Sequence, residues 1–160
     1  MFLKPTYFIH GDLTKVDIDQ LYGDGVRGLI LDLDSTIMAP KSGAITMEAA
    51  EWLDRARPKF KMLVLSNNKR EDYLKNAETL LAMEVLGYAK KPWKSGFARA
   101  LEVLDMPPHE VAAIGDRPLT DILGGQWAGM KTVLVKPLAS IVEPSWKTFF
   151  RNCERALARE

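Results

Sequence analysis

Short apolar runs alternate with longer amphipathic segments along most of the chain. The apolar runs have the length and composition of buried strands, and we predict five of them, at residues 28–31, 62–65, 85–88, 111–114 and 132–135. Apolar residues recur elsewhere at helical spacing, which predicts helices at 47–57, 70–83, 95–104, 120–128 and 145–158 and a short one at 17–22. Apolar strands that alternate with such helices are typical of a parallel sheet covered on both faces. The pattern therefore predicts an α/β fold, a three-layer sandwich around a mainly parallel, Rossmann-like sheet of five strands.

Local signals support the boundaries of two predicted helices. Thr46 and Asn68 stand where their side chains would cap the first turns of the helices at 47–57 and 70–83. Pro58 closes the first of these helices, because proline cannot continue it.

Size and composition favour a single domain. The chain has 160 residues, 47% of them hydrophobic, which is enough for a sizeable core. No internal repeat or long Pro/Gly linker divides it. We predict one domain over residues 1–160, with a core at about 26–136, an N-terminal leader and a C-terminal amphipathic helix.

Charge and cysteine content exclude several classes of protein. The formal net charge is +1 and Lys and Arg are not massed in one tract, so no nucleic-acid partner is expected. Cys153 is the single cysteine, which excludes an internal disulfide framework and fits a reducing compartment. No stretch approaches the roughly 20 apolar residues of a spanning helix, and polar residues near the N-terminus argue against a signal peptide. We expect a cytoplasmic protein, with peripheral attachment to a membrane as an alternative.

Two carboxylates directly follow the first predicted strand. The apolar run 28–31 leads into Asp32 and Asp34, and the hydroxyl residues Ser35 and Thr36 come next. Open α/β sheets bind ligands beyond the carboxyl ends of their strands. Two acids at one strand end repel each other unless a cation or a proton lies between them, and an unpaired acid cluster is costly to bury. This arrangement favours a Mg²⁺ site beside a reactive carboxylate.

Polar side chains also follow other predicted strands. After 62–65, 85–88 and 111–114 come Ser66-Asn67-Asn68, Lys90-Lys91-Pro92 and Gly115-Asp116-Arg117, with Asp121 further along. Each group alone has an ordinary interpretation: a helix cap for the acids, an N-cap turn for the Ser-Asn-Asn run, a solvated charge for the lysine. The strand ends of a parallel sheet share one edge, however. Acids, a hydroxyl and an ammonium gathered there are what phosphoryl transfer requires.

These motifs resemble, in order and spacing, those of the haloacid dehalogenase superfamily of phosphatases. The four motifs are Asp32-Leu33-Asp34-Ser35-Thr36, Ser66, Lys91 and Gly115-Asp116 through Asp121. The compact layout, with Ser-Asn-Asn, Lys-Pro-Trp-Lys and Gly-Asp-Arg-x-x-x-Asp, is similar more narrowly to the capless phosphatidylglycerophosphate phosphatase group. Relatives more often carry Asn or Gly at the position of Ser35. With the five predicted strands counted along the chain, the resemblance implies the order 5-4-1-2-3, which makes the first motif central.

The resemblance also implies chemical roles. Asp32 would attack phosphorus and form an aspartyl-phosphate. Asp34 would protonate the leaving oxygen and then activate water. Lys91, chosen over Lys90 because it directly precedes Pro92, would neutralise charge on the transferring group and on Asp32.

The implied cofactor is Mg²⁺. Its ligands would be Asp32, Asp34 through the backbone carbonyl, and Asp116. Asp121 would support the metal site from outside the ligand shell or hold Lys91. The residues implied to bind the phosphoryl group are Ser66, Asn67 and Thr36.

The spacing of the motifs leaves no room for a separate cap domain. Only a short loop separates Thr36 from the helix at 47–57, and the helix at 70–83 fills most of the stretch between Ser66 and Lys91. We therefore expect a site that is open to solvent unless a partner or a second copy of the chain covers it. An open site suits a large or membrane-tethered phosphomonoester better than a small metabolite.

The predicted C-terminal helix has two distinct faces. Its apolar residues are Trp146, Phe149, Phe150, Cys153 and Leu157, and its basic stripe is Lys147, Arg151, Arg155 and Arg159. A basic face beside an aromatic face can lie on an anionic bilayer. The interpretation we favour is the more common one, a helix that packs its apolar face on the sheet and leaves the Arg heads solvated.

The residues and the resemblance together predict a Mg²⁺-dependent phosphomonoester hydrolase that acts through an aspartyl-phosphate. Phosphatidylglycerophosphate is the leading substrate. One alternative is a phosphatase of a soluble sugar phosphate, nucleotide or phosphoprotein. Another is a receiver-like domain that keeps the aspartyl-phosphate as a stable switch. Asp34 argues against the switch, because an acid at that position suits hydrolysis of the intermediate.

Overall fold

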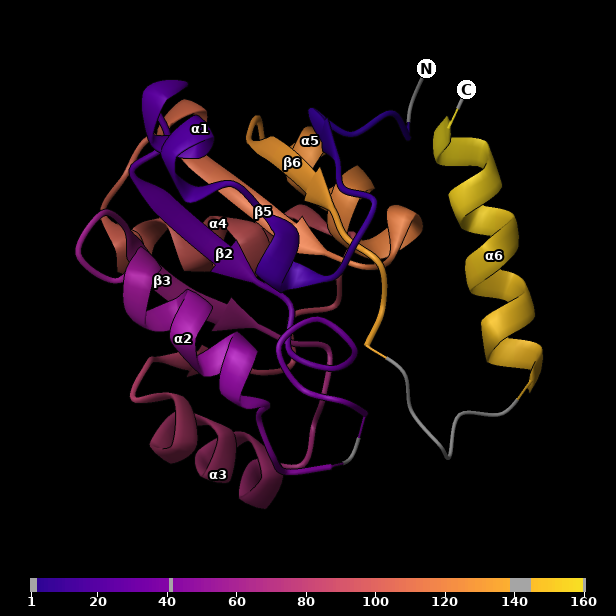
Figure 1. Cartoon of the computed structure of the whole chain (residues 1–160), viewed down its shortest axis with the longest axis horizontal. Coiled ribbons are helices and arrows are strands. Elements are labelled where there is room, and N and C mark those ends of the chain that lie inside the picture. Colours follow the sequence, from indigo (N-terminus) through magenta and orange to yellow (C-terminus); the bar gives the residue numbers. More distant parts are fainter. Residues whose placement is uncertain (1–2, 41, 139–144, 160) are drawn as a thin grey trace.

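A sheet of six parallel strands forms the centre of the fold. The computed structural model describes residues 3–40, 42–138 and 145–159 (Figure 1). The strands are β1 (Tyr7–Phe8), β2 (Gly28–Leu31), β3 (Lys61–Leu65), β4 (Val85–Leu86), β5 (Val111–Gly115) and β6 (Lys131–Leu134). Their order is β1-β6-β5-β2-β3-β4, and each neighbouring pair is parallel. Since β2 lies between β5 and β3, the segments that follow these three strands meet at one edge of the sheet.

The sheet has one strand more than the five that the sequence predicts. Strands β2 to β6 are the predicted ones, and they lie in the order that the resemblance implies. The additional strand β1 pairs with β6, with Tyr7 opposite Val133 and Phe8 opposite Leu134. A strand of two residues has too short a pattern to be recognised, and its partner lies at the other end of the chain. The predicted strand at 85–88 is also shortened, to the two residues of β4.

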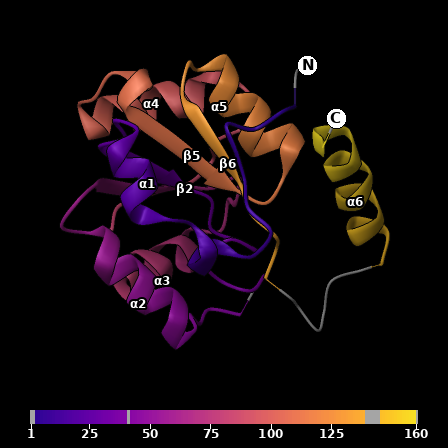
Figure 2. The same cartoon turned by 45° about the horizontal axis from the view of Figure 1, so that its top comes forward.

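Helices cover both faces of the sheet, as predicted (Figure 2). One face holds α1 (Ile18–Gly23), α2 (Met47–Ala56) and α3 (Glu71–Leu81), and the other holds α4 (Lys94–Leu104) and α5 (Leu123–Trp127). Side chains along β2 alternate between these layers. Leu29 and Leu31 belong to the apolar cluster that contains Trp52 of α2, while Ile30 belongs to the cluster that contains Phe97 of α4. The predicted three-layer α/β sandwich is confirmed.

The segment before β6 is less regular than the single helix predicted at 120–128. It begins with a π-helical turn at Pro118–Ile122 and continues as α5. Shorter 3₁₀ turns occur at Leu13–Lys15, before α1, and at Pro108–Glu110, before β5.

One of the two predicted helix caps is confirmed. The Thr46 hydroxyl accepts a hydrogen bond from the backbone N–H of Ala49 in the first turn of α2. Asn68 does not cap α3, because that helix begins only after Arg70. The Asn68 side chain instead accepts the N–H of Arg70 at 2.9 Å and so shapes the turn before the helix.

The C-terminal helix α6 (Ser145–Arg159) lies beside the sheet (Figure 1). The face that it turns inward is the basic one, opposite to the face we expected. Arg151, Glu154 and Arg155 are buried, whereas the aromatic residues Trp146 and Phe149 are 59% and 64% exposed. The prediction of solvated Arg heads is therefore wrong for the two arginines whose side chains the structure describes.

The physical reason is the set of acceptors at the edge of the sheet. The Arg155 guanidinium donates to the carbonyl oxygen of Val135, directly after β6, at 2.6 Å, and to that of Asp116 at 3.3 Å. The Arg151 Nε lies 3.0 Å from a carboxylate oxygen of Asp116. Hydrogen bonds from charged donors to these acceptors stabilise the docked helix more than contacts between an apolar helix face and the polar edge of the sheet would. The basic face of α6 therefore packs against the sheet edge.

Candidate active site

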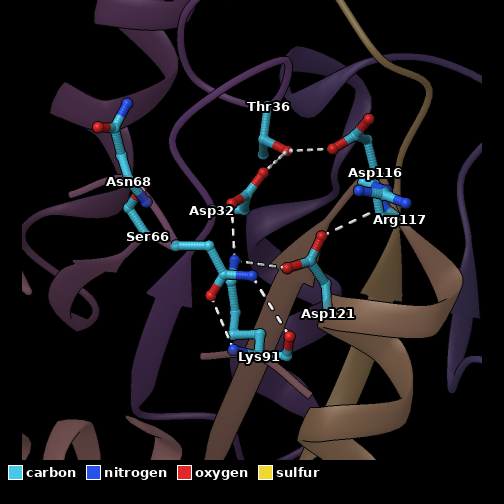
Figure 3. Close-up of polar contacts among 9 residues, drawn as sticks. Asp32, Thr36, Ser66, Asn68, Lys91, Asp116, Arg117 and Asp121 are labelled. Atoms are coloured by element: carbon cyan, nitrogen blue, oxygen red, sulfur yellow. Dashed lines mark hydrogen bonds and ion pairs between the residues drawn. The ribbon is translucent and has the colours of Figure 1, made fainter. Parts of the chain in front are cut away.

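A cavity of about 440 Å³ lies at the carboxyl edge of the sheet. Its walls come from the segments after β2, β3, β4 and β5, together with α6. Figure 3 shows polar side chains from the segments after β2, β4 and β5 converging on one another, with those of Ser66 and Asn68 from the segment after β3 to one side. The residues that line the cavity are Asp32, Asp34, Ser35, Pro40, Ser66, Asn67, Asn68, Lys91, Asp116, Arg117, Thr120, Asp121, Trp146, Lys147, Phe150, Arg151 and Glu154.

The segment after β2 is a tight turn that presents Asp32 to the cavity. The backbone N–H of Asp32 donates to Ile114 of β5 at 2.9 Å, so the strand pairing extends to this residue. Ser35 has a φ of +68°, a left-handed conformation that Gly and Asn adopt at low cost. This conformation explains why an Asn or Gly suits the position, and Ser35 is held there by backbone hydrogen bonds to Met38 and Leu138.

Lys91 lies between two carboxylates. Its ammonium donates to Asp32 Oδ1 at 2.7 Å and to Asp121 Oδ1 at 2.6 Å, and its side chain is only 4% exposed (Figure 3). Burial alone lowers the pKa of Lys91, but the negative charges of Asp121 and Asp32 outweigh it and raise the pKa. Lys91 therefore remains an ammonium, whereas Lys90 is exposed outside the cavity.

Asn67 and Ser66 position the segments around Lys91. The Asn67 side-chain carbonyl accepts the backbone N–H of Lys91 at 2.7 Å, and its amide donates to the Lys91 carbonyl at 3.3 Å. The Ser66 hydroxyl is buried and accepts the N–H of Asn68 at 3.1 Å. Asn67, which the resemblance implies as a phosphate ligand, thus uses its amide to fix the lysine loop.

Asp116 and Asp121 are buried beside Asp32. Thr36 Oγ1 lies 3.2 Å from Asp32 Oδ2 and 3.4 Å from Asp116 Oδ1, so it bridges the first and fourth motifs. Burial, reinforced by the charges of Asp32 and Asp121, raises the pKa of Asp116 well above its usual range. Burial and the charge of Asp32 also raise the pKa of Asp121 to about 6, although Lys91 opposes the shift.

This acid cluster fits a hard divalent cation. One carboxylate oxygen from each of Asp32, Asp116 and Asp121 lies within 4.8 Å of the others. Oxygen ligands of this kind suit Mg²⁺, and a cation among them would relieve the repulsion that raises the two pKa values. The Asp34 carboxylate is not in this cluster, since its Oδ1 accepts the Tyr73 hydroxyl at 2.7 Å.

Gly115 is required by the packing of Asp121. A Cβ at position 115 would stand 2.2 Å from Asp121 Oδ2 and 2.5 Å from Asp121 Cβ, distances at which Asp121 must move. The close approach of this backbone lets the Asp121 carboxylate accept the N–H of Arg117 at 3.2 Å while it also binds Lys91. Neither Asp116 nor Asp121 is the N-cap residue of the helical turn, because Arg117 occupies that position and makes no side-chain capping bond there.

The structure also brings residues to the cavity that the motifs do not contain. Arg151 pairs with Asp116, and Glu154 accepts a 2.8 Å hydrogen bond from Arg117. Tyr73 of α3 reaches Asp34. The four-residue spacing of the basic residues in α6 was a visible signal, but only the fold shows that this face points into the site. The cavity is accordingly less open than the motif spacing predicts, since α6 supplies one wall.

Comparisons with known proteins agree with this fold. A family model described as HAD-hydrolase-like matches residues 88–137. The chain is 31% identical over 140 residues to the probable phosphatase YqeG of Bacillus subtilis (strain 168), a match that covers 87% of this chain and 80% of that protein. It is also 31% identical over 159 residues to phosphatidylglycerophosphate phosphatase 1, chloroplastic/mitochondrial, of Arabidopsis thaliana. That match covers 92% of this chain but only 45% of the plant protein, so the chain spans about half the length of this relative.

Solved structures show the same fold at low sequence identity. An uncharacterized protein from Listeria monocytogenes serotype 4b aligns with a TM-score of 0.61 at 19% identity, covering 74% of this chain and 85% of that one. A predicted HAD-like family hydrolase from Porphyromonas gingivalis aligns with a TM-score of 0.57 at 14% identity, covering 79% and 98%. The chain belongs to the haloacid dehalogenase-like hydrolases. Within that superfamily it is a phosphatase, like the relatives it resembles in sequence.

Proposed function

We propose that the protein is a Mg²⁺-dependent phosphomonoester hydrolase in which Asp32 is the nucleophile. The observation that supports this most is the setting of the Asp32 carboxylate. Lys91 holds Oδ1 at 2.7 Å, while Oδ2 lies 3.2 Å from the Thr36 hydroxyl, which also contacts the buried acid Asp116. One oxygen is thus fixed by an ammonium, and the carboxylate lies on the wall of a cavity large enough for a phosphorylated headgroup.

The reaction proceeds in two displacements at phosphorus. Asp32 attacks the phosphoryl group, the bond from phosphorus to the ester oxygen breaks, and Asp34 gives its proton to the leaving oxygen. Asp34 then removes a proton from water, which attacks the aspartyl-phosphate, so that phosphate leaves and the Asp32 carboxylate is restored. Proton transfer of this kind contributes about 10²–10⁴-fold to the rate.

Positive groups balance the charge of the transferring phosphoryl group. Lys91 neutralises charge on the phosphoryl oxygens, and Ser66 donates a hydrogen bond to them. Thr36 is fully buried, and its hydroxyl donates to Asp32 and so holds the nucleophile in place. Asp121 holds Lys91, as its 2.6 Å contact supports, rather than acting as a direct metal ligand.

Of the three clustered acids, Asp32 and Asp116 would hold Mg²⁺ through their carboxylates. The backbone carbonyl of Asp34 would be a further ligand. When bound, Mg²⁺ supplies positive charge to the phosphoryl oxygens and lowers the repulsion between substrate and carboxylates.

The leading substrate is phosphatidylglycerophosphate. The relatives from Arabidopsis thaliana and Chlamydomonas reinhardtii, at 31% and 30% identity, are both phosphatidylglycerophosphate phosphatases by name. A lipid substrate also fits the cavity mouth, where Trp146 and Phe150 line the cavity and are more than half exposed. The two rings pack edge to face with their centroids 6.3 Å apart, so a glycerophosphate headgroup would enter the cavity beside this pair while its acyl chains stay in a bilayer.

The outward face of α6 would then rest on the membrane surface. Phe149 and Leu157 are 64% and 60% exposed on the same helix, and aromatic rings beside Lys147 suit an anionic interface. No helix in the described part of the chain is long and apolar enough to cross a membrane. Attachment would therefore be at the surface. Co-sedimentation with vesicles tests this: recovery should rise with anionic lipid and fall for Phe149→Ser, and equal recovery with and without lipid would reject it.

The test of the function is Mg²⁺-dependent phosphate release from phosphatidylglycerophosphate in mixed micelles. A panel of soluble sugar phosphates, nucleotides and phosphopeptides is assayed beside it, with Asp32→Asn as the inactive control. We expect preference for the lipid and loss of activity in the variant. Turnover of a soluble ester alone would keep the chemistry and reject the lipid.

A further inference from the structure

One cation of the cavity has no carboxylate partner among the residues that the structure describes. Of these residues, four with basic side chains line the cavity, and three of the four are paired with carboxylates. Lys91 is paired with Asp32 and Asp121, Arg117 with Glu154, and Arg151 with Asp116. The fourth is Lys147 of α6, which has no carboxylate within ion-pair distance in the described part of the chain.

Lys147 is exposed at the outer end of the site. It lies one helical turn before Arg151, which corresponds to about 6 Å along the axis of α6. Because Arg151 contacts Asp116 at the inner end of the cavity, Lys147 lies further toward the mouth on the same face of the helix. Its ammonium is 5.6 Å from the ring centroid of Trp146, which also lines the cavity. A cation beside an aromatic ring at the mouth is suited to an anionic group attached to a carbon chain.

We propose that Lys147 binds a second phosphate group of the substrate, separated from the scissile phosphate by a short polyol such as glycerol. The proposal rests on the proposed function, because it places the scissile phosphate at Asp32. The second anion is a phosphodiester if the substrate is a lipid, or a phosphomonoester if it is a soluble bisphosphate. In either case α6, rather than a cap domain, selects the substrate.

The alternative for Lys147 is a solvated lysine with no ligand, and selectivity between substrates separates the two. Three esters share the same scissile group: glycerol 3-phosphate, glycerol 1,3-bisphosphate and short-chain phosphatidylglycerophosphate. Glycerol 3-phosphate lacks the second phosphate that the other two carry. A subsite at Lys147 therefore affects the last two esters only. A change in folding, or in the chemistry at Asp32, affects all three.

The experiment measures kcat/KM for these three esters with the wild type, Lys147→Gln and Lys147→Arg. Lys75→Gln is the matched control, since Lys75 is an exposed lysine on α3. We expect Lys147→Gln to lower kcat/KM about tenfold on the two doubly phosphorylated esters, mainly through KM. The kcat/KM of Lys147→Gln for glycerol 3-phosphate should equal that of the wild type. Lys147→Arg should keep the preference for the doubly phosphorylated esters, and Lys75→Gln should behave as wild type on all three.

Two results would overturn the proposal: an equal effect of Lys147→Gln on all three esters, including none, or no hydrolysis of either doubly phosphorylated ester by the wild type. A selective effect with the soluble bisphosphate, but no activity on the lipid, would keep the subsite and reject the lipid assignment. Loss of phosphate release from every ester in the wild type would reject the proposed function as well.

Discussion

The guanidinium of Arg151 and the carboxylate of Asp116 form an ion pair of 3.0 Å inside the candidate active site. Both side chains are buried, and they come from α6 and from the segment after β5. The same carboxylate is our proposed Mg²⁺ ligand. Arg151 therefore holds α6 against the site and also adds positive charge beside the place proposed for the metal.

Replacing Arg151 should strengthen Mg²⁺ binding. In Arg151→Gln the competing guanidinium is gone, so the affinity for Mg²⁺ should rise roughly tenfold. Isothermal titration calorimetry of the metal-free protein measures this directly, without an activity assay. Arg55→Gln, which removes an exposed arginine of α2, is the control and should leave the affinity unchanged. Weaker Mg²⁺ binding by Arg151→Gln would show that Arg151 supports the metal site instead.

Asp116 and Asp121 should couple the stability of the protein to pH and to Mg²⁺. Burial and the charge of Asp32 raise the pKa of Asp121 to about 6, and the pKa of Asp116 is raised as well. Both folded-state values exceed the unfolded value of 3.8. Without metal, the native state thus holds protons that the unfolded state has released. Its stability should fall as the pH rises from about 4 through about 6.

Mg²⁺ should reverse this dependence, since it replaces those protons among the carboxylates. The rise in Tm on adding Mg²⁺ should be several degrees larger at about pH 7.5 than at about pH 5. Scanning calorimetry at both pH values, with and without Mg²⁺, measures the two increments. Asp116→Asn should abolish most of the difference. Equal increments at the two pH values in the wild type would contradict a metal site at these acids.

The hydrogen bond from Tyr73 to Asp34 predicts a leaving-group effect. The Tyr73 hydroxyl lies 2.7 Å from Asp34 Oδ1 and so orients the proposed acid. Tyr73→Phe should lower kcat/KM about tenfold for alkyl phosphates, whose leaving oxygen needs a proton. For p-nitrophenyl phosphate, whose leaving group needs none, kcat/KM should change little, because it does not include the later hydrolysis of the aspartyl-phosphate. The same loss with both kinds of ester would mean that Tyr73 supports the fold rather than Asp34.

The sequence predicted the sheet and the acids well because both depend on local patterns. The apolar run of β2 ends at Asp32 in the sequence as in the structure, and parallel pairing then brings Lys91 and Asp116 to the same edge. β1 was missed because two residues have no recognisable pattern. The contact between Tyr73 and Asp34 was also out of reach, since Tyr73 occupies an ordinary apolar position of α3.

The orientation of α6 shows a different limit. Its two faces are plain in the sequence, but the spacing does not tell which face docks. That choice depends on the Asp116 carboxylate and the Val135 carbonyl, which accept Arg151 and Arg155 only once the sheet has formed. Amphipathicity alone favoured the apolar face, and ion pairing with the site favoured the other.

The central claim, covalent transfer of the phosphoryl group to Asp32, is tested most directly by mass spectrometry of Asp34→Asn. With p-nitrophenyl phosphate and Mg²⁺, this variant should form the aspartyl-phosphate without a proton donor and hydrolyse it slowly, because no base activates water. We predict an intact mass increased by one phosphoryl group, located on the peptide that contains Asp32 and absent when Asp32 is also changed to Asn. Turnover by the wild type with no covalent phosphate in the variant, or phosphate on another residue, would contradict the account.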